Sequence, residues 1–125
     1  MKEVQKQVAE FTDYIGATPE SQLLKFKEEA IEALLAHADS GHSETFAREL
    51  TDVVIVSLGL IHCMGLDFET LFDEKMQIAW NKYRLVPTYI EQGDPPELAQ
   101  ARAKGLWMGQ EPMDDGRWDS NGERF

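Results

Sequence analysis

Apolar residues recur at steps of three and four through most of the chain before residue 85, the spacing that places them on one face of an α-helix. This pattern predicts four helices, over residues 1–15, 19–38, 44–64 and 67–84. A short further helix is possible over residues 97–104. We therefore expect an all-α protein, built as an antiparallel bundle of four to five helices.

Residues that favour helix ends stand at the predicted boundaries. The starts carry side chains that cap helix N-termini: Thr18 (followed by Pro19), Ser43 and Asp67. The ends carry glycines, which adopt the left-handed conformation that closes many helices: Gly16, Gly41 and Gly65.

The run VVIV at residues 53–56 is β-branched and is also compatible with a strand. We favour a helix because no turn signal separates this run from ELTD before it, and Gly65 is the first clear break after it. A helix that is apolar nearly all round belongs at the centre of a bundle. In a chain of 125 residues, we expect a second subunit to cover part of this helix, so that oligomerisation completes the core.

The composition changes after residue 92, where Gly, Pro, Trp and acidic residues replace the periodic pattern. We therefore expect a helical domain over residues 1–92, which carries the candidate chemistry, and an irregular C-terminal extension of it over residues 93–125. The extension is either pinned by Trp107 and Trp118 or partly disordered.

The formal net charge of −11 argues against two classes of partner. Nucleic acids and anionic membranes favour basic surfaces, so we expect neither. The longest apolar run, residues 53–61, is too short for a membrane-spanning helix, which needs ~20 residues. Cys63 is the only cysteine, which excludes an intrachain disulfide and suits the reducing cytoplasm, where we expect the protein to reside.

Two acidic pairs stand at the same spacing in the two predicted central helices. Glu29 and Glu32 lie three residues apart, and so do Glu49 and Asp52. Residues at this spacing are separated by about 60° around a helix and about 4.5 Å along it, so each pair shares a face. If residues 39–43 join the two helices as an antiparallel hairpin, the pairs lie at matched distances from the turn. The four carboxylates then converge.

Four ionised carboxylates in a partly buried pocket repel one another, so a cation is needed to neutralise them. Oxygen-only ligands suit hard divalent cations, and we expect Mg²⁺, with Mn²⁺ as a substitute. Such cations also engage substrate phosphates, which would allow so acidic a protein to bind a phosphorylated molecule. The alternative is a solvated acidic face, which is the usual role of a single Glu-x-x-Glu pair on a helix.

The segment EEAIE at residues 28–32, followed after sixteen residues by ELTD at residues 49–52, resembles the EExxE…ExxD signature of MazG-type all-α nucleoside triphosphate pyrophosphohydrolases. That superfamily also includes dimeric dUTPases and phosphoribosyl-ATP pyrophosphohydrolases, and small members of it occur in phages. The resemblance spans about residues 20–85. It implies cleavage of a nucleoside triphosphate between the α- and β-phosphates, in a homodimer or homotetramer. It also implies Mg²⁺ ligation by Glu29, Glu32, Glu49 and Asp52, with Glu28 as an accessory member of the catalytic group.

The resemblance further implies donors for the phosphate oxygens, because members of the superfamily carry Lys, Asn and Arg residues in the last core helix. The candidates in this chain are Lys75, Asn81, Lys82 and Arg84. The alternative is that these are ordinary cations near a helix C-terminus, where the helix dipole favours them. Lys25, one turn before Glu29, either reaches a phosphate or pairs with Glu28 or Glu29.

Two other classes of protein remain open. A di-metal carboxylate bundle uses Glu-x-x-His motifs, and no glutamate in the chain stands three residues before a histidine. A non-catalytic helical dimerisation module with a solvated acidic face would need neither metal nor substrate. Of the three, we expect the enzyme, with a nucleoside triphosphate as its substrate.

Overall fold

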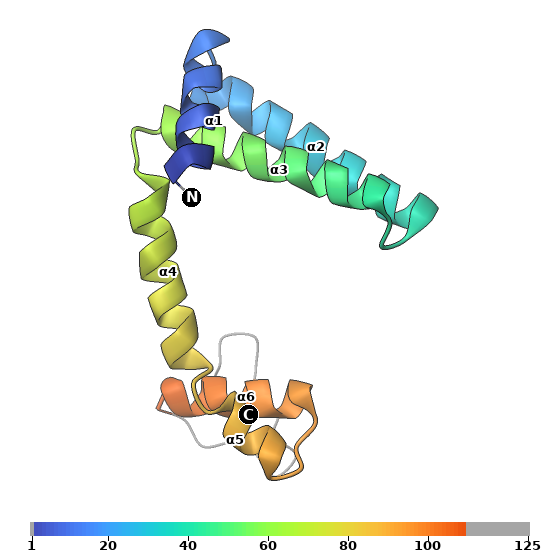
Figure 1. Ribbon diagram of the computed structural model, residues 1–125, viewed down its shortest axis with the longest axis vertical. Helices are drawn as coiled ribbons and strands as arrows, with labels where there is room; N and C mark the ends of the chain where they lie inside the picture. The colour runs from blue at the N-terminus through green and yellow to red at the C-terminus, as the bar shows by residue number, and fades with distance from the viewer. Residues whose placement is uncertain (1, 110–125) are drawn as a thin grey trace. The chain divides into compact units, whose positions relative to one another are not determined.

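The computed structural model describes residues 2–109, and all its regular secondary structure over this range is helical (Figure 1). The helices are α1 (Lys2–Tyr14), α2 (Pro19–Ser40), α3 (Glu44–Cys63), α4 (Phe68–Lys82), α5 (Val86–Glu91) and α6 (Pro96–Trp107). The predicted all-α class is confirmed. The described residues divide into two compact units, residues 2–71 and residues 72–109.

Polar caps begin α2 and α3 where the sequence predicted them. Thr18 Oγ1 accepts a hydrogen bond from the Ser21 backbone N–H at 3.1 Å, and Ser21 Oγ accepts one from the Thr18 N–H at 2.9 Å. Ser43 Oγ accepts a hydrogen bond from the Phe46 N–H at 3.1 Å. Between the two helices, Gly41 adopts a φ of +63°, which glycine reaches without steric cost. The short connection then allows α3 to return along α2.

In the first unit, α2 and α3 pack side by side as an antiparallel hairpin, and α1 packs against α3 (Figure 1). The VVIV run lies inside α3, so the predicted helix is confirmed and the strand is excluded. The buried residues of α3 are Val56, Leu58 and Gly59. Because α3 contacts both α1 and α2, it is the central helix of this unit, as its apolar composition predicted.

The junction of α1, α2 and α3 is polar and tightly packed. Thr12 of α1 and Gln22 of α2 are only 3% and 4% exposed. A Cβ atom added at Gly59 of α3 would lie 2.9 Å from both Thr12 Oγ1 and Gln22 Oε1. The Thr12 hydroxyl donates to the Val8 carbonyl oxygen at 2.7 Å, which holds it in place. A glycine at position 59 therefore lets the backbone of α3 approach two buried polar side chains.

The apolar stripe of α2 is largely exposed among the residues that the structure describes. Leu34 and Leu35 are 70% and 63% exposed, and Ile31 is 57% exposed. The sequence predicted that a second subunit completes the core, and this oligomerisation stays a prediction.

Asp67 caps the start of α4. Its Oδ2 atom accepts hydrogen bonds from the Thr70 N–H at 3.1 Å and from the Thr70 hydroxyl at 2.7 Å. Gln5 of α1 donates to Asp67 Oδ1 at 2.7 Å. The hydrogen bond from Gln5, followed by those from Thr70, lowers the pKa of Asp67 below its ordinary value. The N-terminal helix is thereby tied to the start of α4.

In the second unit, α5 and α6 pack together around Tyr89, Ala99 and Ala103, all of them buried. Arg102 donates to Asp94 at 2.6 Å, and its guanidinium lies 4.2 Å from the centre of the Tyr89 ring. The short helix that was possible over residues 97–104 is present as α6. The domain boundary between residues 92 and 93 stays a prediction, and Trp118 lies outside the described residues.

Within residues 2–109, no single helix is long and apolar enough to cross a membrane. The segments Glu44–Cys63 and Phe68–Glu91 reach the length and composition of a membrane span only when they are taken together, and the chain bends sharply between them.

Candidate metal centre

Facing positions of α2 and α3 bring three predicted ligands together. Glu29 and Glu32 are one turn apart on α2, and Glu49 lies on α3. One carboxylate oxygen from each of the three lies within 4.8 Å of the others. This convergence requires the antiparallel hairpin, because only the side-by-side packing of α2 and α3 brings Glu49 next to Glu29 and Glu32.

Asp52 belongs to the same electrostatic group, one turn beyond Glu49 on α3. The pKa of Glu29 is raised above its ordinary value, chiefly by partial burial and then by the negative charges of Glu32 and Asp52. A hydrogen bond with Glu32 and the charge of Glu49 add to this shift. The other three carboxylates of the predicted set therefore each disfavour ionisation of Glu29.

Glu49 carries the clearest sign of a missing partner. Its Oε2 atom is buried and has no hydrogen-bond donor among the residues that the structure describes. A buried acceptor without a donor costs about 1–3 kcal/mol, and more when it is charged. A cation at this position would satisfy it.

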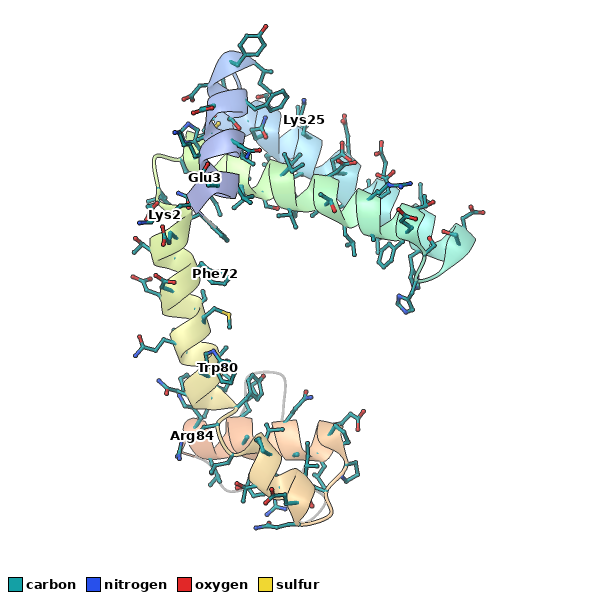
Figure 2. All side chains as sticks on the ribbon, viewed as in Figure 1. Lys2, Glu3, Lys25, Phe72, Trp80 and Arg84 are labelled. Atoms are coloured by element: carbon teal, nitrogen blue, oxygen red, sulfur yellow. The ribbon has the colours of Figure 1, made fainter. Side chains whose placement is uncertain are left out.

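No basic side chain neutralises the cluster within residues 2–109. The basic side chains of this range pair with other acids: Arg48 forms an ion pair with Glu44 and Arg102 with Asp94, and the His62 ring forms a hydrogen bond with Asp13. Lys25 projects from α2 one turn before Glu29 and forms no ion pair with it (Figure 2). The cluster offers three oxygen ligands and an adjacent fourth carboxylate. Among the described residues, one of its oxygens lacks a donor and no basic side chain balances its charge. These properties fit a hard divalent cation.

Other predicted site residues lie outside this cluster. Glu28 is exposed on α2 and is not among the converging ligands. Lys75, Asn81, Lys82 and Arg84 belong to the second compact unit, so they are not brought together with the carboxylates in one unit. Within that unit, Asn81, Lys82 and Arg84 line a single pocket, whereas Lys75 is exposed on α4 and does not line it.

The same pocket includes Trp107, which the sequence suggested only as an anchor for the C-terminal extension. No spacing in the sequence connects Trp107 with residues 81–84, because the pocket forms only where the end of α6 lies beside residues 81–85 in the folded unit. The only sequence signal was its large aromatic side chain in an otherwise irregular segment.

These features define the class of protein: an all-helical protein with a carboxylate cluster suited to a divalent cation. A family model for phosphoribosyl-ATP pyrophosphohydrolase matches residues 2–77, which is more than half of the chain and includes all four carboxylates. The chain belongs to the phosphoribosyl-ATP pyrophosphohydrolase family. The predicted pyrophosphohydrolase class is confirmed at this level. No curated protein and no solved structure matches the chain.

Proposed function

We propose that the chain is a Mg²⁺-dependent nucleotide pyrophosphohydrolase of the MazG-like type. It cleaves a nucleoside or deoxynucleoside triphosphate between the α- and β-phosphates and releases a monophosphate and pyrophosphate. The observation that carries this proposal is the convergence of Glu29, Glu32 and Glu49 within 4.8 Å, together with a Glu49 oxygen that is buried without a donor. The family assignment supports the type of linkage that is cleaved.

Glu29, Glu32, Glu49 and Asp52 would hold the Mg²⁺, or Mn²⁺ in its place. When bound, the cation neutralises the carboxylates, lowers the pKa of a water molecule and stabilises charge that develops on the phosphoryl oxygens. The ligand set contains only oxygens, which is the preference of both ions. A cation also removes the repulsion between a triphosphate and a protein of net charge −11.

Glu29 is our first candidate for the residue that orients the attacking water, and Glu32 is the second. In the metal-free protein the pKa of Glu29 is raised, first by partial burial and then by the charge of Glu32, and a bound cation would counteract the part that comes from neighbouring charges. The water oxygen forms a bond to phosphorus, the bond from phosphorus to the bridging oxygen breaks, and the water proton passes to the carboxylate. No side chain becomes covalently modified. Glu28 keeps an accessory role next to Glu29.

Donors for the phosphate oxygens complete the proposal. Lys25 lies on α2, in the same unit as the carboxylates, and has no ion-pair partner within residues 2–109. Lys75, Asn81, Lys82 and Arg84 are the candidates from the second unit. We further propose that the enzyme acts in the cytoplasm as a homodimer or homotetramer, which the exposed apolar stripe of α2 supports.

The decisive experiment is an assay for pyrophosphate release with Mg²⁺ and a panel of substrates. The panel contains the common ribo- and deoxyribonucleoside triphosphates and phosphoribosyl-ATP, because the family model names the last. Glu49→Gln and Asp52→Asn are tested in parallel. We expect pyrophosphate from at least one substrate and a loss of at least a hundredfold in the variants, because each removes a charged group from the cation site.

Each alternative has its own outcome. If no nucleotide yields pyrophosphate and neither Mg²⁺ nor nucleotide changes thermal stability, the chain is a non-catalytic helical module. If both variants retain full activity, the carboxylate assignment is wrong although the class is right. Bound iron in the purified protein would identify a di-metal bundle of another chemistry.

A further inference from the structure

Two of the three histidines of the chain lie together where α2 connects to α3, at the tip of the hairpin (Figure 1). His37 belongs to the last turn of α2, and His42 stands in the connection, two residues before α3 begins. Their ring centres are 4.8 Å apart and the ring planes are inclined by 59°. We call His37 and His42 the histidine pair.

The backbone of the connection holds the histidine pair together. The Gly41 N–H donates to the His37 carbonyl oxygen at 2.7 Å, and the φ of +63° at Gly41 turns the chain just before His42. The hydroxyls of Ser40 and Ser43 lie 2.6 Å apart and close the same turn. His42 is therefore placed beside His37 by a closed turn.

The ring of Phe46, on the first turns of α3, packs against both members of the histidine pair. Its centre lies 5.0 Å from that of His37, edge to face, and 6.0 Å from that of His42. These contacts restrict both imidazoles, so less conformational entropy is lost when a ligand binds them.

Aromatic packing alone makes no use of the imidazole nitrogens. Among residues 2–109, neither ring of the histidine pair forms a hydrogen bond or an ion pair, and both residues are exposed. The third histidine differs: His62 Nε2 lies 2.8 Å from an Asp13 carboxylate oxygen. The histidine pair thus presents two neighbouring nitrogen ligands to the solvent.

The spacing of the two rings fits one shared metal ion. With metal–nitrogen bonds of about 2.1 Å, two imidazoles in adjacent coordination positions have ring centres roughly 4.5–5.2 Å apart. The observed 4.8 Å falls in this range. Rotation about the Cβ–Cγ bond turns either nitrogen of a ring toward the ion and leaves the ring centre almost in place. We propose that the histidine pair binds a divalent transition-metal ion of the Zn²⁺ type, with water molecules completing its coordination.

This site would select a different kind of ion from the carboxylate cluster. Imidazole nitrogen suits Zn²⁺, Ni²⁺ and Cu²⁺, whereas ligand sets made only of oxygens suit Mg²⁺ and Mn²⁺. His37 lies five residues beyond Glu32, about 7.5 Å further along α2, so the two sites are separate on the same hairpin. The proposal therefore does not depend on the proposed catalytic activity.

The test is isothermal titration of the full chain with Zn²⁺, in an excess of Mg²⁺ that occupies the carboxylate cluster. We expect saturable binding of one Zn²⁺ per chain. His37→Gln and His42→Gln should each weaken it at least tenfold, because even the loss of an outer partner of a metal ligand costs 10–100-fold in affinity. His62→Gln is the matched control, since it removes a histidine outside the pair and should retain the wild-type affinity.

Nuclear magnetic resonance of the imidazole groups gives a second readout on the unmodified protein. Because the chain has three histidines, their ring signals can be followed separately during the Zn²⁺ titration. We expect the signals of His37 and His42 to shift together, at the affinity that calorimetry gives, and that of His62 to stay in place.

The proposal is wrong if Zn²⁺ shifts neither ring of the histidine pair, which would leave these rings with aromatic packing alone. It is also wrong if His62→Gln weakens binding as much as His37→Gln. Loss of Zn²⁺ binding in Glu49→Gln, with full binding in both variants of the histidine pair, would assign the ion to the carboxylates instead.

Discussion

A carboxylate oxygen of Glu32 on α2 lies within 4.8 Å of one of Glu49 on α3, and an oxygen of Glu29 lies within 4.8 Å of both. Like charges at this separation repel, so the arrangement destabilises the metal-free protein unless protons or cations compensate. The cluster is therefore a place where ligand binding and folding stability are directly coupled.

We expect Mg²⁺ or Mn²⁺ to raise the thermal unfolding midpoint. A ligand that binds only the native state stabilises it by about 2.7 kcal/mol at a concentration one hundred times its dissociation constant. Glu49→Gln should abolish most of this shift, whereas Glu10→Gln, an exposed acid on α1, should retain it. Scanning calorimetry with and without EDTA measures the midpoints of the wild type and the variants. A wild-type midpoint that does not change in millimolar Mg²⁺ or Mn²⁺ would contradict the proposed metal site.

Glu29 should make the metal-free protein less stable as the pH rises through the weakly acidic range. Its pKa is raised in the folded state, by partial burial first and by Glu32 next, so the folded protein binds more protons than the unfolded chain between the ordinary carboxyl pKa and the raised value. Stability is then lost as the pH increases across that window.

The matching variant is Glu29→Gln, which cannot ionise. In EDTA near neutral pH it should be more stable than the wild type, and its stability should depend less on pH over the same window. Glu28→Gln, an exposed neighbour outside the converging ligands, serves as the control. Urea unfolding at several pH values measures the difference. If Glu29→Gln is the less stable protein in EDTA, repulsion in the cluster is not significant.

Gly59→Ala should destabilise the protein by about 1–3 kcal/mol, although glycine to alanine normally favours a helix. The new Cβ would lie 2.9 Å from Thr12 Oγ1 and from Gln22 Oε1, both in buried side chains. The test is therefore whether Gly59→Ala lowers or raises the stability of the protein, which thermal unfolding measures. Gly59→Ala should cost less stability in a Thr12→Ala background than it does in the wild-type protein, because the Thr12 hydroxyl is then absent. A stabilised Gly59→Ala protein would mean that the three helices are not packed this closely.

We expect the purified chain to have a mass that is a multiple of 14.2 kDa in light scattering. The exposed apolar side chains of α2 are the expected interface, so Leu34→Arg and Leu35→Arg should shift the protein to a monomer. Tyr14→Arg is a control, because Tyr14 is 88% exposed at the end of α1, away from this stripe. A wild-type protein that is monomeric at micromolar concentration would exclude this interface.

The helices of the first 82 residues could be predicted because their signals are local. Thr18 and Ser43 cap the helices that follow them, and Asp67 does the same for α4. The three-residue spacing of Glu29 and Glu32 sets their common face through helix geometry alone. The family signature added the pairing of these residues with Glu49 and Asp52.

Other features required contacts between residues far apart in the chain. The buried oxygen of Glu49 lacks a donor because of what surrounds it, and sequence spacing carries no information about that environment. Trp107 joins Asn81, Lys82 and Arg84 in one pocket only because folding brings the end of α6 beside residues 81–85.

The apolar stripe of α2 also shows which features follow from the sequence and which require the packed structure. Its periodicity identified an amphipathic helix, and the pattern alone could not distinguish a face covered by this chain from one left exposed. Helix formation and face composition follow from neighbouring residues, through backbone hydrogen bonds and capping. Burial, charge coupling and pocket shape follow from how the helices pack, since only packing determines which surfaces are removed from water.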